Sequence, residues 1–61
     1  MENNLGKILK ERNLSYDRVA RDLKKSKTTI ANNVKSDTMH SSTMEEYADY
    51  LEMEVKEIFK F

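Results

Sequence analysis

Cysteine and proline are absent from this chain of 61 residues, and glycine occurs once, at Gly6. Without cysteine there is no disulfide and no thiolate metal site, and the one histidine, His40, cannot form a zinc site alone. β-Hairpins and β-sandwiches need glycine and proline in their turns, so the scarcity of these two residues favours a fold of short helices. Apolar runs are at most two residues long, far below the ~20 that a membrane-spanning helix needs.

The length predicts a single domain over residues 1–61. A domain of this size buries only about 60% of the surface that its unfolded chain exposes. Its stability must then come from packing, helix caps or self-association, because disulfides and metals are excluded. The lack of cysteine fits a reducing cytoplasm, and the N-terminal residues show no apolar stretch typical of a secretory signal. We therefore expect a cytoplasmic protein with no membrane partner.

Acidic and basic residues balance, since the formal net charge is zero, but they are unevenly distributed. Residues 18–35 carry six bases against one acid, and residues 36–61 carry two bases against seven acids. A basic middle can face phosphates while an acidic end faces away, although such runs are also common on solvated helix faces.

Apolar residues recur at helical spacing in five segments. These segments span residues 4–12, 16–23, 27–35, 43–52 and 55–60.

Several residues are typical of helix ends. Ser15 and Ser26 are suited to cap the second and third segments, and Asn13 can end the first because asparagine tolerates the left-handed conformation. Ser42 and Glu45 match a capping box, which predicts that the fourth segment begins directly after Ser42.

The third segment has an apolar stripe of only Ile30 and Val34, and its other positions are lysine, threonine and asparagine. Asparagine and threonine are indifferent helix formers, so a helix rich in them suggests a face used for hydrogen bonding. The second segment, just before it, contains the small residue Ala20 and, three positions later, Leu23. A turn-sized gap separates this segment from the third, which contains Ile30. A small residue lets two helices cross closely and a branched apolar residue fills the contact, which is the geometry of a helix-turn-helix over residues 16–35.

In these features the chain resembles the Cro and lambda-type repressor family, also called the XRE family, over residues 5–59. Residues 13–23 (NLSYDRVARDL) follow the family's second helix with its central alanine. Ser26 and Ile30 match its recognition helix, and residues 47–59 (YADYLEMEVKEIF) match the apolar rhythm of its last two helices.

The resemblance implies an all-α fold of five short helices and a transcriptional regulator, of the Cro-like phage repressor type, that binds operator DNA in the major groove. The implied base contacts are Lys27, Thr28, Ala31 and Asn32. The implied phosphate contacts are Tyr16, Ser26, Lys24, Lys35 and Lys10. Repressors of this sort bind inverted repeats as dimers, and the apolar Phe59 and Phe61 are candidate dimer contacts, unless they fold back onto the first helix.

Four positions depart from the family pattern: Lys24 and Glu52 replace glycines, Lys25 replaces an apolar residue, and Asn33 takes a usually buried position. These changes predict either a looser turn or a third helix that is rotated or shifted by one residue. The chain is also compatible with the DNA-binding domain of a longer repressor or antitoxin. The neutral net charge, together with Lys24 and Asn33, leaves open a protein-interaction module that has kept the fold but lost DNA binding. No nucleophile–base pair or phosphate-cradling glycine loop is present, so we expect no catalysis, cofactor or small-molecule substrate.

Overall fold

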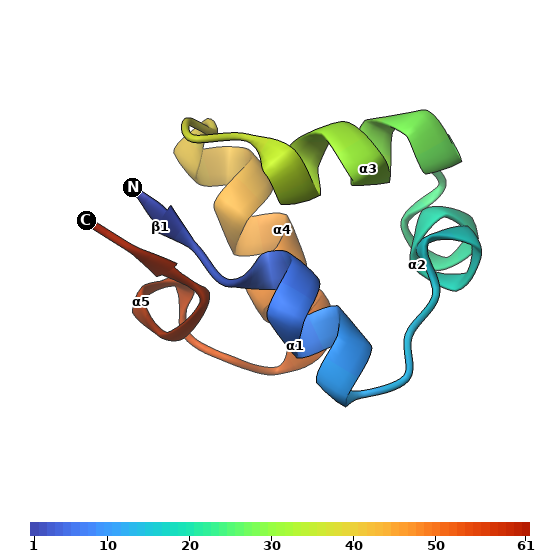
Figure 1. Ribbon diagram of the computed structural model, residues 1–61, viewed down its shortest axis with the longest axis horizontal. Helices are drawn as coiled ribbons and strands as arrows, with labels where there is room; N and C mark the ends of the chain where they lie inside the picture. The colour runs from blue at the N-terminus through green and yellow to red at the C-terminus, as the bar shows by residue number, and fades with distance from the viewer.

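The computed structural model describes residues 1–61 and contains five helices with one short strand at each end of the chain (Figure 1). In chain order the elements are β1 (Glu2–Asn3), α1 (Leu5–Glu11), α2 (Tyr16–Leu23), α3 (Lys27–Lys35), α4 (Ser41–Leu51), α5 (Val55–Ile58) and β2 (Phe59–Lys60). The helical class and the bounds of α2 and α3 are those predicted from the sequence. No helix is both long and apolar enough to cross a membrane.

Three helices end in the same way, on a non-glycine residue with a left-handed backbone. Asn13, Lys24 and Glu52 have φ angles of 57°, 57° and 56° and follow α1, α2 and α4. In each case the next residue's N–H reaches back to a carbonyl of the helix, as Lys25 N does to Ala20 O at 2.8 Å. These bonds satisfy terminal carbonyls that would otherwise lack partners. The role predicted for Asn13 is confirmed.

The N-terminal caps are partly as expected. The Ser15 hydroxyl accepts from the backbone N–H of Arg18, and the Ser26 hydroxyl accepts from that of Thr29, both at 3.1 Å. The capping box predicted at Ser42 is wrong, because α4 begins earlier, at Ser41, and its first hydrogen bonds run to the backbone carbonyl of His40. A capping box is found instead at the start of α5.

The C-terminal segment departs most from expectation. The helix predicted over residues 55–60 ends at Ile58, and β2 pairs antiparallel with β1, with Phe59 opposite Asn3. The backbone N–H of Asn4 also bonds the carbonyl of Ile58 at 2.9 Å. Pairing with the N-terminus satisfies the backbone of these residues in place of a further helical turn, and brings the two chain ends together (Figure 1).

The core draws residues from all five helices and from β2. Twelve residues are buried: Leu5, Ile8, Leu9, Val19, Ala20, Ile30, Met44, Tyr47, Ala48, Leu51, Ile58 and Phe59. Phe59 has no exposed surface, so its side chain is not available as a dimer contact, and that part of the expectation is corrected. Phe61, by contrast, is 91% exposed.

Gly6 allows α1 to lie directly against α3. A Cβ at Gly6 would stand 2.7 Å from Cγ1 of Val34, closer than two carbon atoms can pack. The single glycine of the chain is thus used for a helix contact rather than for a turn.

Candidate nucleic-acid interface

The turn between α2 and α3 is tight although it lacks glycine. Lys24 takes the left-handed conformation, and its N–H lies 3.3 Å from the carbonyl of Arg21. The expectation of a looser turn is therefore wrong, because a lysine can adopt the same left-handed backbone as glycine at some cost in energy. A rotation or one-residue shift of the third helix stays a prediction.

The helix-turn-helix contact lies on the inner sides of the two helices. Ala20 and Ile30 are buried, and Leu23 is half-buried against the same core. With this side of α3 facing the core, its opposite side is left to solvent along the upper edge of the molecule in Figure 1.

The outward side of α3 carries the residues that the resemblance implied as base contacts. Lys27, Thr28 and Asn32 are exposed, and Ala31 is half-buried between them. Lys27 lies 3.6 Å from a carboxylate oxygen of Asp17, with both side chains well exposed, so this ion pair is weak and easily exchanged. The face therefore combines a mobile cation with an amide, a hydroxyl and a methyl group.

The start of α3 has free backbone donors and a serine cap. The Ser26 hydroxyl lies 3.1 Å from the backbone nitrogen of Thr29 and 2.8 Å from its hydroxyl oxygen. The remaining N–H groups of the first turn have no partner within the helix and carry partial positive charge, which favours an anion at this end of the helix.

Basic side chains around α3 fall into two groups. Lys24 and Lys35 are exposed, whereas Lys25 is half-buried and pairs with Glu46 on α4 at 3.1 Å. Thus Lys25, at a position where the family has an apolar residue, connects the turn to α4. Tyr16, at the start of α2, is half-buried.

Lys10 does not join this group. It is exposed near the C-terminal end of α1, which Figure 1 places on the side of the molecule away from α3.

Asn33 faces inward, unlike its neighbour Asn32. Its side-chain nitrogen donates to the hydroxyl of Tyr47 on α4 at 2.6 Å. Burial raises the pKa of Tyr47, so the hydroxyl stays protonated at neutral pH. The sequence showed Asn33 as a departure, but its partner lies fourteen residues away and no local pattern identifies it.

Asn3 is the residue that sequence reasoning missed. Its side-chain oxygen accepts from the N–H of Leu5, the first residue of α1, at 3.0 Å. Its nitrogen also lies 2.9 Å, 3.3 Å and 3.0 Å from the carbonyl oxygens of Asn33, Val34 and Ser36, at the end of α3. Only the fold brings these groups together.

A second cluster connects α2 to α4. The Tyr50 hydroxyl donates to a carboxylate oxygen of Asp22 at 2.6 Å, and Arg18 donates to the same oxygen at 3.1 Å. The Tyr50 hydrogen bond, together with Arg18, holds the pKa of Asp22 below its usual value. Partial burial and the same hydrogen bond raise the pKa of Tyr50.

A capped and outward-facing α3, held by a tight turn against α2 and flanked by free lysines, defines a DNA-binding domain of the helix-turn-helix class. A family model described as the Cro/C1-type HTH DNA-binding domain matches residues 4–61. The chain belongs to this family, which confirms the resemblance seen in the sequence and identifies a regulator that binds double-stranded DNA. Comparison with curated proteins and with solved structures gave no match.

Proposed function

We propose that residues 1–61 form one domain that acts as a Cro-like repressor and reads operator DNA with α3. The observation that carries this proposal is the division of α3 into a buried apolar side and an exposed side bearing Thr28, Asn32 and Lys27. An asparagine can bond N6 and N7 of adenine together, and the methyl groups of Ala31 and Thr28 can contact a thymine methyl.

Phosphate contacts would surround this face. Ser26 and the free N–H groups at the start of α3 suit one phosphate, and the exposed Lys24 and Lys35 suit others. The half-buried Tyr16 can reach a phosphate only with its hydroxyl. We leave Lys10 out of the proposed interface because its end of α1 lies away from α3 (Figure 1).

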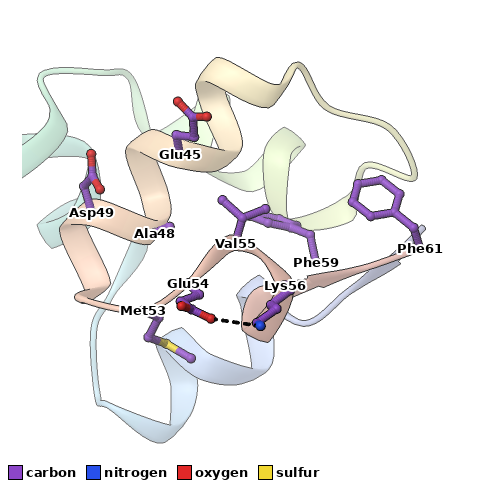
Figure 2. Close-up of a pocket in the computed structure, with 9 residues that line it drawn as sticks. All are labelled: Glu45, Ala48, Asp49, Met53, Glu54, Val55, Lys56, Phe59 and Phe61. Carbon is purple, nitrogen blue, oxygen red and sulfur yellow. Dashed lines mark ion pairs between the residues drawn. The ribbon is translucent and has the colours of Figure 1, made fainter.

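A second copy would bind the other half of an inverted repeat, with the half-sites about 34 Å apart. A groove of about 560 Å³ lies between α4 and the C-terminal residues, and its apolar lining includes Met53 and Val55 (Figure 2). Glu45 and Asp49 stand along one side of it, and the Phe61 ring lies at one end. A basic and apolar pair such as Lys60 and Phe61 of a second copy complements this groove in charge and in hydrophobicity.

The first test is selection from a pool of random duplexes, followed by sequencing of the retained DNA. An enriched inverted repeat supports a symmetric dimer on an operator and supplies its sequence. A single enriched half-site supports sequence-specific recognition by α3 and contradicts the symmetric dimer. No enrichment by the folded protein contradicts the proposed repressor.

Single substitutions then test the assigned residues on the enriched duplex. Asn32→Ala should weaken binding to it by about 1–3 kcal/mol, with little effect on a scrambled duplex. Lys7→Ala is the matched control for Lys27→Ala, because Lys7 lies among Glu2, Glu11 and Glu57, away from a phosphate-binding surface. Phe61→Ser should abolish dimers in sedimentation on DNA while half-site binding persists.

A regulator of this kind works where its DNA lies, so we place it with the DNA of a bacterial cell or of a phage-infected host. Repression would follow from an operator that overlaps a promoter. A reporter gene under that promoter tests this directly, since an activator would raise its expression and a repressor would lower it.

A further inference from the structure

The C-terminal half of α3 is held by polar contacts from two distant parts of the chain. Asn33 donates to the hydroxyl of Tyr47, whose ring is fully buried within the core on α4. Asn3, in β1, donates to carbonyl groups at the end of α3, including those of Asn33 and Ser36. The recognition helix is thereby connected to α4 and to the paired chain ends.

The end of α3 differs from those of α1, α2 and α4. Those three helices are closed by a left-handed residue of their own, whereas Ser36, after α3, is extended with φ −78° and ψ 140°. The Asn33 carbonyl accepts from the N–H of Ser36 at 3.3 Å, and Asn3, some thirty residues earlier in the chain, supplies a further donor to the carbonyls of Asn33, Val34 and Ser36. The chain therefore satisfies this end of α3 with a contact that also fixes where the helix end lies.

The Asn33 contact fixes rotation in the same way. An apolar side chain at this position would pack without a preferred direction, but a hydrogen bond weakens steeply when its angle changes. Because α3 is a rigid helix, any rotation that breaks the bond between Asn33 and Tyr47 also turns Asn32 and Thr28. The inward-facing asparagine thus controls the direction of its outward-facing neighbour.

We propose that Asn33, Tyr47 and Asn3 are positioning residues, which set the orientation of α3 and so determine sequence specificity without touching DNA. This inference rests on the proposed function, since it needs α3 to read bases. Lysines on the turn and at the helix end are long and flexible, so phosphate binding tolerates a small rotation that misaligns base contacts.

The test compares affinity for the selected duplex with affinity for a scrambled duplex, at one salt concentration and at a temperature where circular dichroism shows every variant folded. Asn33→Ala and Asn3→Ala should each lower the ratio of the two affinities about tenfold, the effect of losing roughly one bidentate base contact. Affinity for the scrambled duplex and its salt dependence should stay the same.

Matched controls exist for both positions. Asn4→Ala removes a neighbouring asparagine whose side-chain nitrogen bonds only Glu2, and Tyr50→Phe removes the other tyrosine hydroxyl of α4, which bonds Asp22 rather than α3. Both controls should keep the wild-type ratio. A control that lowers the ratio as far as Asn33→Ala does would overturn the proposal.

The double variant Asn33→Ala with Tyr47→Phe separates positioning from stability. It removes the buried hydroxyl that Asn33→Ala leaves without a partner, so it should regain thermal stability while its affinity ratio stays low. If the ratio recovers together with stability, the contact is merely structural and the proposal fails. Should Asn33→Ala not fold, Tyr47→Phe alone gives the same comparison, because it keeps the ring in the core.

Failure of this inference is distinguishable from failure of the proposed function. A wild-type protein without any preferred duplex overturns both. A wild-type preference that every positioning variant retains overturns only the inference.

Discussion

Two helix ends lower the stability of the fold, since Lys24 and Glu52 hold a left-handed backbone that glycine adopts without strain. Relief of that strain is worth about 1–2 kcal/mol for an L-residue. Glycine offsets part of it, about 0.5–1 kcal/mol, through the greater freedom of the unfolded chain. The net gain expected for Lys24→Gly or Glu52→Gly is therefore about 0.5–1 kcal/mol, which raises Tm by roughly 4–8 °C in a domain of this size.

Alanine at the same positions removes the charge but keeps the strain, so it isolates the backbone effect. Lys24 places a cation and Glu52 an anion at the negative end of a helix, after α2 and α4 respectively. Lys24→Ala should then destabilise slightly and Glu52→Ala should stabilise slightly. The difference between the glycine and alanine variants should nevertheless be the same at both positions, because both have φ near 57°.

Urea denaturation followed by circular dichroism measures these differences as changes in midpoint at constant slope. A glycine variant no more stable than its alanine partner at both positions would refute the reasoning, since the left-handed conformation would then carry no net cost. Asn13→Gly provides an internal scale, because asparagine tolerates this conformation and the gain there should be smaller. Glu52→Gly is the cleaner variant, as Lys24 is also a proposed phosphate contact.

Three further predictions follow from single contacts. Gly6→Ala should destabilise by about 1–3 kcal/mol through overlap with Val34, and Val34→Ala, destabilising alone, should restore part of that loss when the two are combined. Tyr50→Phe should be less stable than wild type near neutral pH. In denaturation measured at several pH values, this difference should fade as the pH falls below 3.8 through the lowered pKa of Asp22. It should also fade as the pH rises beyond 10.0 through the raised pKa of Tyr50. A difference constant with pH would contradict that hydrogen bond. Lys35→Ala should reduce the salt dependence of DNA binding by about one ion and weaken binding to all duplexes alike, and a loss confined to the selected duplex would reassign Lys35 to base contact.

Features set by residues close in sequence could be predicted well. Ser15 and Ser26 act as caps through backbone groups three residues away, and Asn13 ends α1 by its own tolerance of positive φ. The apolar spacing gave the helices, and the same helical period separates the exposed Thr28 and Asn32 from the buried Ile30. The composition of the candidate interface therefore follows from local rules.

Features that depend on pairing across the chain could not be predicted. Phe59 and Lys60 continue the helical pattern, yet they pair with Glu2 and Asn3 because the fold brings both ends together. Such pairing has no signal in either segment alone.

The two capping-box sites illustrate the same limit. Ser42 and Glu45 match the sequence pattern better than Glu54 and Glu57, since serine is a preferred cap and glutamate is not. The box nevertheless forms at Glu54, while Ser42 lies within α4. A pattern shows that a cap can form, but the path of the chain before the helix decides where the helix begins.

The exposed and inward-facing sides of α3 would affect the choice of DNA target in different ways. Exposed side chains of α3 can be exchanged at little cost in stability, and each exchange would alter one of the proposed base contacts. The direction of α3, in contrast, depends on Asn33, Tyr47 and Asn3, which are contributed by three separate elements. Substitution of these residues would shift all base contacts together. We therefore expect substitutions on the exposed side of α3 to change the preferred DNA sequence one base at a time, and substitutions of the three positioning residues to change it at several bases at once.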